Sequence, residues 1–517
     1  MHLIIPMSGS GKRFKDAGYT VPKPLIVVDG RPMIHHVVDL FPGVQNVTFI
    51  CNKDDIQNTN MRAILVSACP WANIIVIDSH KKGPVYAIAQ IFDSIADEEE
   101  VIVSYCDYGT RWDFDQFLIE ARNGQFDGAL ACYRGFHPHM LGSDNYAFCR
   151  EDGRVLLEIK EKESFTSNKM SEFASNGTYY FRTGAILKKY FRELMDRDIN
   201  INGEYYVSLV YNLLIRDGLK SLIFEIENML QWGTPYDLEI YQGWSRYFAA
   251  LNKPVASVPS QDFVLVLPMA GRGERFVKEG YAQPKPLIPI DGMPMFVRAV
   301  SCLPKHEDAI FIGLRNHAGI DRIIHKHYPN ASVSLIDAVT EGQACTCEIG
   351  IREAGIDADT PILISACDNG ALYDRQKFIE LMDDQDNDVI VWSFRNSQAS
   401  KTNPSMYSWL DVDDNGFVRH VFCKQLPWGD PLKTHAIIGT MYFRKARHFL
   451  DGLHANRRQN RRANGEFYVD DVLNQNIESG LKVKIFEVDH YVCWGTPNDY
   501  KTYNYWNDYF NVHNSKR

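Results

Sequence analysis

Short apolar runs alternate with amphipathic stretches along the chain, and the same order of runs occurs twice. In the first half the apolar runs lie at 3–5, 47–50, 74–77, 101–104 and 129–132, with helix-like stretches such as 85–96 between them. In the second half they lie at 263–267, 309–312, 333–336, 362–365 and 389–392. Runs of this length predict buried strands, and strands that alternate with helices predict a mainly parallel sheet covered by helices on both faces.

Several sequence motifs recur in the second half at one fixed offset. The loop Gly-x-Gly-x-Arg-Phe at 9–14 recurs at 271–276, and Pro-Lys-Pro-Leu at 22–25 recurs at 284–287. Asn-Gly-Glu at 202–204 recurs at 464–466, and Trp-Gly-Thr-Pro at 232–235 recurs at 494–497. Self-similarity on this scale indicates a duplicated domain.

The length of 517 residues is too great for one hydrophobic core and allows two domains of ordinary size. We predict domains at 1–250 and 263–517. The segment 251–262 carries two prolines and two serines between an aromatic helix-like stretch at 241–248 and the restarted strand, so we assign it as the linker. A similar aromatic stretch at 500–510 closes the second copy.

Composition narrows the class of protein. Hydrophobic residues make up 45% of the chain and charged residues 23%, as in ordinary globular proteins. No apolar run is long enough to span a membrane and the first residues lack signal-peptide features, so we expect a cytoplasmic protein with no membrane partner. The eleven cysteines include no Cys-x-x-Cys pair, which favours reduced thiols over disulfides or zinc. A net charge of −10 argues against a nucleic-acid partner.

The glycine-rich loops directly follow a predicted strand, so their backbone N–H groups can approach a phosphate closely. Phe14 and Phe276 stand where a dinucleotide-binding loop needs a third glycine, and neither loop has the Gly-Lys-Ser/Thr of a Walker loop. Arg13 and Arg275 can each fork onto triphosphate oxygens. A solvated basic loop is the alternative, but its spacing would not be expected to recur in the second copy.

Two further charged positions recur beside these loops. Lys23 and Lys285 each stand between two prolines, in a stiff segment that offers a fixed positive charge. Asp107 and Asp368 each follow a central apolar strand. Because binding sites in such sheets lie beyond the carboxyl ends of the strands, we expect the loop and the aspartate of each copy to meet at one edge of the sheet.

Together with Asp-Gly-x-Pro-Met at 29–33 and 291–295, these motifs resemble the sugar-phosphate nucleotidyltransferase family, and the resemblance covers both halves almost end to end. It implies two tandem Rossmann-like nucleotidyltransferase domains, each an α/β domain with a mainly parallel central sheet flanked by helices. It also implies that a nucleoside triphosphate and a sugar phosphate, or a related phosphorylated alcohol, condense to a nucleotide-activated product and pyrophosphate. Such products supply surface polysaccharide synthesis.

The resemblance implies a Mg²⁺ ion held by Asp107 in the first copy and by Asp368 in the second. Many members carry a second metal-binding Asp two residues before the late Gly-Thr-Pro, where this chain has Gln231 and Cys493. The candidate substitutes are Glu227 and Asp489, for which an exposed charge at a strand edge is an equally good interpretation. The acidic groups that hold the metal therefore stay open beyond the first aspartate.

On the acceptor side, the resemblance implies a Glu-Lys pair, a strand with Gly-x-Tyr and a turn with Gly-Glu-x-Tyr. The matching acceptor-binding candidates are Glu161, Lys162, Asn176, Gly177 and Glu204 in the first copy and Lys424, Gly439 and Glu466 in the second. The second copy has Cys423 in the place of Glu161 and Ile438 in the place of Asn176. We therefore predict that the two acceptor sites differ.

On the nucleotide side, the candidates are Met7, Ser8, Gly9, Gly11, Asp78 and Gly83, with Met269, Ala270, Gly271, Gly273, Asp337 and Gly342 as their counterparts. Asp78 and Asp337 could accept N–H groups of guanine or cytosine, or the N3–H of uracil or thymine, so the base stays open. The catalytic candidates are Arg13, Lys23, Arg275 and Lys285.

Three hypotheses follow for the whole chain. The first is a fused pair of active nucleotidyltransferases with different acceptors. The second is one active copy with a degenerate structural or regulatory copy, and the third is a nucleotide-sugar sensor without turnover. Retention of the Arg, the Lys and the Asp in both copies favours the first, because binding alone does not require a metal-positioning carboxylate. A homo-oligomer is left open.

Overall fold

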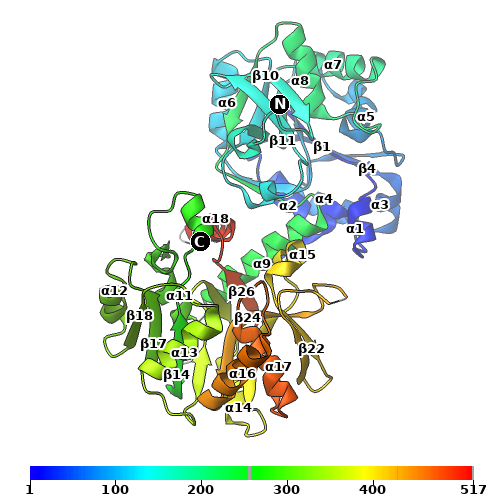
Figure 1. Cartoon of the computed structure of the whole chain (residues 1–517). Coiled ribbons are helices and arrows are strands. Elements are labelled where there is room, and N and C mark those ends of the chain that lie inside the picture. Colours follow the sequence, from blue (N-terminus) through cyan, green and yellow to red (C-terminus); the bar gives the residue numbers. More distant parts are fainter. Residues whose placement is uncertain (254–257, 428, 515–517) are drawn as a thin grey trace. The chain divides into compact units, whose positions relative to one another are not determined.

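The computed structural model describes residues 1–253, 258–427 and 429–514 (Figure 1). The chain divides into two compact units: unit 1 is Met1–Arg246 with Asp508–Arg517, and unit 2 is Tyr247–Asn507. The boundary between the compact units lies inside the helix α9 (Pro235–Leu251), between Arg246 and Tyr247. That 1–250 and 263–517 are two nucleotidyltransferase domains remains a prediction. Of the predicted linker, residues 254–257 lie outside the described residues.

Unit 1 is built on a nine-stranded sheet with the order β5-β4-β1-β6-β11-β8-β12-β10-β9. Its strands are β1 (His2–Met7), β4 (Asn46–Asn52), β5 (Asn73–Ile77), β6 (Val101–Ser104), β8 (Gly128–Tyr133), β9 (Ala147–Asp152), β10 (Val155–Glu161), β11 (Phe173–Phe181) and β12 (Ser221–Glu225). The pairs β5/β4, β4/β1, β1/β6 and β8/β12 are parallel. β11 runs antiparallel between β6 and β8, and β10 and β9 form an antiparallel edge.

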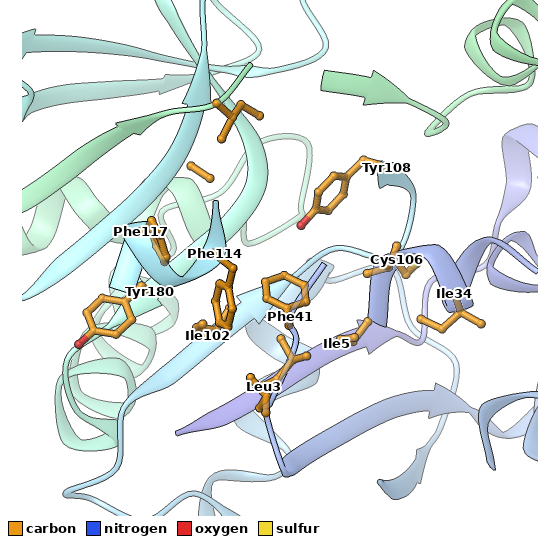
Figure 2. Close-up of a cluster of buried hydrophobic side chains, with 14 of the residues drawn as sticks. Leu3, Ile5, Ile34, Phe41, Ile102, Cys106, Tyr108, Phe114, Phe117 and Tyr180 are labelled. Atoms are coloured by element: carbon orange, nitrogen blue, oxygen red, sulfur yellow. The ribbon is translucent and has the colours of Figure 1, made fainter. Parts of the chain in front are cut away.

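The predicted strands of unit 1 are present, and helices cover both faces of their sheet. Leu3 and Ile5 of β1 point into one hydrophobic cluster and Ile4 points into the other, which is the alternation that a doubly covered strand requires. Helices α2 (Met33–Val38), α4 (Met61–Ala68) and α6 (Phe114–Asn123) close the first cluster. Helices α5 (Gly83–Ala89), α7 (Gly184–Asp196) and α8 (Val207–Arg216) close the second. Figure 2 shows the first cluster, where Leu3, Ile5 and Ile102 of the sheet lie near Phe41 and Phe114.

Unit 2 is built on a sheet whose main path has the order β18-β17-β14-β19-β24-β21-β25, with β22 joined to β24 and β23 joined to β22. Its strands are β14 (Gln261–Pro268), β17 (His306–Leu314), β18 (Ser332–Ile336), β19 (Ile362–Ile364), β21 (Val389–Phe394), β22 (Trp409–Val412), β23 (Val418–Phe422), β24 (His435–Phe443) and β25 (Val483–Glu487). Along this main path the order and direction of the strands match those of unit 1, with β24 as the antiparallel strand inside the sheet. The edges differ, because β10 of unit 1 pairs with β12, whereas β23 of unit 2 pairs with β22. The sequence repeat thus coincides with a repeated sheet topology.

Helices also cover both faces of the sheet in unit 2. Helices α11 (Met295–Ser301), α12 (Ile320–His327) and α14 (Arg375–Asp383) pack on one face. Helices α13 (Gln343–Glu353), α16 (Ala446–Gln459) and α17 (Val469–Glu478) pack on the other. The expected aromatic helix near the end of the chain is α18 (Pro497–Asn514).

Short elements complete each unit. In unit 1 they are α1 (Lys12–Asp16), η1 (Lys23–Leu25), β2 (Val27–Val28), β3 (Arg31–Pro32), α3 (Lys53–Asn58), η2 (Phe92–Ser94), β7 (Tyr108–Arg111), η3 (Pro138–Leu141), η4 (Lys169–Ser171) and β13 (Asn228–Gln231). In unit 2 they are α10 (Glu274–Lys278), η5 (Lys285–Leu287), β15 (Pro289–Ile290), β16 (Met293–Pro294), β20 (Asn369–Leu372), α15 (Gln398–Thr402), η6 (Pro404–Met406) and β26 (His490–Cys493). The pairs β7/β13 and β20/β26 are antiparallel ladders beside the main sheets.

Two observations bear on composition. All eleven cysteines are free thiols, and most of them are buried. Over the part of the chain that the structure describes, no helix combines the length and the apolar character that a membrane crossing needs.

Candidate active site

A pocket of about 390 Å³ opens in unit 1 where β1 and β6 end. The glycine-rich loop, the segments after β5 and β6, the end of β10 and the middle of β11 all contribute to its wall. Of the residues predicted from the sequence, the pocket brings together Ser8, Gly9, Gly11, Arg13, Lys23, Gly83, Asp107, Glu161, Lys162, Asn176, Gly177 and Glu204. The predicted nucleotide, metal and acceptor residues of the first copy therefore share one cavity for the most part.

Three predicted residues of unit 1 lie elsewhere. Met7 is buried and lines a smaller neighbouring cavity of about 130 Å³. Asp78 is exposed beyond β5, and it is His80, two residues further on, that lines the pocket. Glu227 is exposed in the turn before β13, where its carboxylate lies 3.9 Å from Arg111 Nε.

Lys23 and Asp107 form an ion pair on the wall of the pocket, with 2.6 Å between Nζ and Oδ2. Pro22 and Pro24 flank Lys23 at the start of η1, so the backbone that carries the ammonium group is stiff. Burial alone would lower the pKa of Lys23, but the adjacent Asp107 carboxylate raises it above its ordinary value. Lys23 is therefore a fixed and permanently charged group at the edge where a phosphate chain would lie.

Gln231 lies close to Asp107, beside Gly233. Gln231 pairs with Tyr108 in the β13/β7 ladder. A Cβ placed on Gly233 would lie 3.0 Å from Asp107 Oδ2 and 3.4 Å from Gln231 Oε1, so both side chains face the same small space. Mg²⁺ takes one or two carboxylates and completes its shell with phosphate and water, so one carboxylate beside an amide oxygen fits it.

The predicted metal role of Glu227 has no such support, because its carboxylate lies on the exposed side of the turn. Within the described ranges, no group of three or more His, Cys, Asp or Glu side chains is arranged to hold a metal ion. Any ion at Asp107 therefore depends on phosphate oxygens for most of its ligands.

The acceptor end of the pocket is a chain of hydrogen bonds. Ser208 donates to Glu161 Oε2 at 2.6 Å, and burial raises the pKa of Glu161 against the opposing effect of that bond. Lys162 donates to the Tyr206 hydroxyl at 2.5 Å, and Tyr206 donates to Glu204 at 2.5 Å. Ser208 was not predicted, because it lies on α8 and approaches the end of β10 only in the folded chain. Tyr206 is the tyrosine of the Gly-Glu-x-Tyr turn that the resemblance implied, but its hydrogen bonds to Lys162 and Glu204 were not predicted.

Asn176 adds an unused donor to this end of the pocket. Its Oδ1 accepts the N–H of Thr178 at 2.9 Å, while its Nδ2 is buried without a hydrogen-bond partner among the described residues. A buried amide donor without a partner is costly, so its place in the pocket wall suits a ligand oxygen.

A second unpredicted pair lies at the nucleotide end. His80 Nε2 is 3.0 Å from Ser8 Oγ, and the N–H of Lys82 donates to His80 Nδ1 at 3.2 Å. Burial lowers the pKa of His80, so the ring is neutral and its Nε2–H donates to Ser8. Unit 2 has Ala270 and Val339 at these places, so this pair belongs to unit 1 alone.

Gly83 and Gly342 each lie in tight contact with the backbone of a second segment, Gly83 with Tyr205 and Gly342 with Phe467. Tyr205 N–H donates to Lys82 O at 2.9 Å, and Val85 N–H donates to Tyr205 O at 3.2 Å. In unit 2 the N–H of Phe467 donates to the carbonyl of residue 341 at 2.8 Å, and the N–H of residue 344 donates to Phe467 O at 3.1 Å. A Cβ on Gly83 would lie 2.8 Å from Tyr205 backbone atoms, and one on Gly342 would lie 2.5 Å from the Phe467 carbonyl oxygen. Only glycine fits at these positions, because the backbone of the second segment leaves no room for a Cβ; we call this contact the clasp.

The ion pair is repeated in unit 2, where Lys285 at the start of η5 donates to Asp368. Burial would raise the pKa of Asp368, but Lys285 holds it below the ordinary value. A Cβ on Gly495 would lie 3.0 Å from Asp368 Oδ2 and 3.2 Å from Cys493 Sγ, so Cys493 takes the place of Gln231. Burial raises the pKa of Cys493, and a protonated thiol is a poor ligand for Mg²⁺, so Cys493 does not replace the Gln231 amide as a ligand.

The remaining predicted residues of unit 2 lie as follows. Met269 and Ala270 are buried, Gly271 and Arg275 are exposed, Gly273 caps α10, Gly439 lies in β24, and Glu466 and Asp489 are exposed. Asp337 is exposed and accepts from Arg315 Nε at 2.7 Å. Lys424 donates to Met406 O at 3.0 Å and lies 5.1 Å from the ring centre of Tyr468, as Lys162 lies 4.4 Å from that of Tyr206.

Comparison with known proteins identifies the class of the first unit. Residues 3–167 match the family model described as the MobA-like NTP transferase domain. Unit 1 therefore carries a nucleotidyltransferase-type domain over these residues, whereas this match does not extend to unit 2.

Two relatives illustrate the similarity. The bifunctional protein GlmU of Marinobacter nauticus is 26% identical over 227 residues, which are 43% of this chain and 46% of the relative. The GlmU of Staphylococcus epidermidis is 24% identical over 239 residues, which are 44% of this chain and 48% of the relative. The chain thus spans about half the length of the curated relatives it matches.

Solved structures show weaker similarity. The nucleoside-diphosphate-sugar pyrophosphorylase of Vibrio cholerae RC9 is 19% identical with a TM-score of 0.39, over 46% of this chain and 99% of that one. The inositol-1-phosphate CTP transferase of T. maritima is 12% identical with a TM-score of 0.38, over 48% of this chain and 97% of that one. Neither similarity is strong enough to define the fold of this chain.

Proposed function

We propose that unit 1 transfers a nucleotidyl group from a nucleoside triphosphate to a phosphorylated sugar or alcohol, and that unit 2 catalyses the same class of reaction on a different acceptor. The observation that carries the proposal is the pocket of about 390 Å³ in unit 1. There the glycine-rich loop, the Lys23–Asp107 pair and the Glu161–Lys162 segment meet within a chain segment that matches an NTP transferase domain. We further propose that the protein acts in the cytoplasm and supplies nucleotide-activated sugars.

In the proposed reaction of unit 1, the backbone of the glycine-rich loop and Arg13 bind the triphosphate. An oxygen of the acceptor phosphate attacks the α-phosphorus in line, and pyrophosphate leaves. Transfers of this kind need positioned charge rather than a protein nucleophile, so Lys23 acts by stabilising negative charge on the phosphates. Asp107, with the Gln231 amide beside it, would hold Mg²⁺, which supplies further neutralisation of the triphosphate oxygens.

The acceptor is oriented at the other end of the pocket. Glu161 and the unused Nδ2–H of Asn176 offer one acceptor and one donor group to sugar hydroxyls. Lys162 offers a positive charge to the acceptor phosphate, and its bond to Tyr206 holds it in place until the ligand binds. In this proposal the two reacting phosphates lie between Lys23 and Lys162.

The proposed activity of unit 2 is supported by features of unit 1 that recur in it. The sheet has the same strand order, the Lys285–Asp368 pair repeats the Lys23–Asp107 pair, and Lys424 lies over Tyr468 as Lys162 lies over Tyr206. A copy that had lost activity would be expected to lose these charged pairs first. The sensor hypothesis is disfavoured for the same reason, because binding alone does not require the aspartate.

The test is pyrophosphate release by the full chain with each of the common nucleoside triphosphates and with aldose and alditol phosphates as acceptors. Lys23→Ala and Lys285→Ala variants assign each activity to a unit, with the exposed Lys220→Ala as the matched control. We expect two activities, each removed by one variant. Triphosphate binding without pyrophosphate release would establish a sensor, and loss of all activity in Lys23→Ala alone would establish one active copy.

A further inference from the structure

The end of β10 in unit 1 and the end of β23 in unit 2 are held against a helix in the same register. Asn212 of α8 donates to Ile159 O at 2.8 Å and accepts from Ile159 N–H at 3.0 Å. Asn474 of α17 donates to Val421 O at 2.9 Å and accepts from Val421 N–H at 2.9 Å. These double hydrogen bonds make positions around them directly comparable between the units.

One turn before the asparagine, the helix faces the last residue of the strand segment. In unit 1 this contact joins Ser208 to Glu161, with the carboxylate on the strand side. In unit 2 the same two places hold Asp470 and Cys423. Ser408, at the place of Tyr146, donates to Asp470 Oδ2 at 2.5 Å, and its Oγ is 3.7 Å from Cys423 Sγ. Unit 2 therefore keeps one carboxylate at this contact but carries it on the helix.

Two side chains around this carboxylate are smaller in unit 2. Glu161 and Tyr146 line the pocket of unit 1, and Cys423 and Ser408 take their places in unit 2. Ser208 is fully buried behind Glu161 at 0% exposure, whereas Asp470 is 6% exposed. Both helix positions are buried, but the strand residue in front of the helix-borne carboxylate, Cys423, is shorter than Glu161. On the neighbouring strand, Ile438 of β24 replaces the amide of Asn176.

We propose that Asp470 is the residue of unit 2 that binds the acceptor hydroxyls and sets acceptor specificity, in place of the glutamate on the strand of unit 1. This inference rests on the proposed nucleotidyl transfer by unit 2. Because the carboxylate is set back and its two neighbours are small, unit 2 takes an acceptor that is bulkier on this side than the acceptor of unit 1. Because Ile438 offers no hydrogen bond, that acceptor is less polar where it meets β24.

The test uses the full chain with Lys23→Ala, so that unit 2 alone turns over. Glycerol 3-phosphate, glucose 1-phosphate and N-acetylglucosamine 1-phosphate serve as acceptors of increasing bulk. Asp470→Asn is expected to raise the KM for the best acceptor about 10- to 100-fold, as the loss of a charged hydrogen bond would, and to leave the KM for the triphosphate within about twofold. Glu478→Gln, an exposed carboxylate on the same helix, is the matched control and should change neither value.

Moving the carboxylate from the helix back to the strand distinguishes acceptor binding from a merely structural role. Asp470→Ser removes the carboxylate, and Cys423→Glu alone places two carboxylates in contact, so each single change should raise the acceptor KM. Together they recreate the arrangement of unit 1, and the double variant should recover most of the lost affinity and favour the smaller acceptors.

An unchanged acceptor KM in Asp470→Asn, or a double variant no better than the singles, would overturn the inference while leaving the proposed function standing. A parent with Lys23→Ala that releases no pyrophosphate with any acceptor would instead overturn the proposed function of unit 2, and this inference with it. Turnover of the parent is therefore measured first, and it separates the two failures.

Discussion

Unit 1 and unit 2 share the backbone that would position a triphosphate and differ in the side chains that would choose a ligand. Both have the same order of strands along the main path of the sheet, the same Lys–Asp pair, and a tightly packed glycine at the start of the helix that follows β5 or β18. They differ at Glu161 and Cys423, at Asn176 and Ile438, and in the His80–Ser8 pair that only unit 1 has. If both units act as proposed, the duplication kept the residues that face the triphosphate and changed those that face the acceptor.

The largest expected effect tests the shared part of this comparison. Lys23→Ala and Lys285→Ala should each lower turnover of its own unit by about 10²- to 10³-fold, because each removes a preorganised charge beside the phosphates. Steady-state pyrophosphate release with the preferred acceptor of each unit measures this effect. Retention of near wild-type turnover in the double variant would show that the ion pairs are structural and that the shared frame is not an active site.

The sequence predicted the strands and the recurring loop well, because short apolar runs and repeated motifs are local signals. The resemblance implied a strand at the Gly-x-Tyr motif, which lies in β11, but the antiparallel direction of β11 was not predicted, because the residues of a fully buried strand carry no sign of its direction. The acceptor side was harder still. Ser208 and Asp470 lie far along the chain from Glu161 and Cys423, and only the helix packing brings each pair together.

At two turns the predicted residue does not line the pocket. Glu227 and Asp78 each stand next to a strand end, but a strand end has an exposed side as well as a pocket side, and both carboxylates lie on the exposed one. In their neighbourhood, the pocket is lined instead by Gln231 and His80. Whether a turn residue points to the pocket or to solvent depends on the pairing of the strands beside the turn, and the pattern of residue types does not reveal it. For Glu227 these strands are β7 and β13.

The clasped glycines offer a second test of the shared frame. Gly83→Ala and Gly342→Ala should each destabilise their own unit by about 1–3 kcal/mol, since both glycines have a positive φ and no room for a Cβ. Gly342→Ala should cost more, because its Cβ would lie 2.5 Å from Phe467 O against 2.8 Å from Tyr205 in unit 1. Urea unfolding midpoints measure the loss.

Gly9→Ala and Gly271→Ala are matched controls for this test, because nothing lies within 4 Å of a Cβ built at either position. They should leave the midpoints unchanged and weaken triphosphate binding, since the loop backbone would no longer approach the phosphates closely. Equal stability of all four variants would contradict the common clasp.

Asp237 and Asp499, in the first turns of α9 and α18, allow a test by pH. Burial raises the pKa of Asp237 to about 6 from 3.8, and burial also raises the pKa of Asp499. A carboxyl whose pKa is raised on folding stabilises the protein when protonated, and this contribution is lost as the pH rises through about 6. From pH 4 to pH 7, unfolding free energy should fall by about 2 kcal/mol more in the wild type than in Asp237→Asn.

The exposed Asp16→Asn on α1 is the control and should keep the wild-type slope. A slope in Asp237→Asn that matches the wild type would show that the buried carboxyl does not titrate as its surroundings indicate. The same measurement with Asp499→Asn asks whether the two units share this property.

The smallest expected effect concerns the first residue of the helix after the glycine-rich loop, whose charge is opposite in the two units. Lys12 begins α1 and lines the pocket of unit 1, whereas Glu274 begins α10 at the same place in unit 2. An exposed charge near a bound polyanion contributes modestly and is screened by salt. Lys12→Glu should therefore raise the triphosphate KM of unit 1 by about 3- to 10-fold at low ionic strength, and Glu274→Lys should lower that of unit 2 by a similar factor. Measured at about 0.05 and about 0.3 M salt, both effects should shrink as the Debye length shortens. A triphosphate KM that ignores both charge changes would place the phosphates away from the first turn of these helices, and with them the site that the two units are proposed to share.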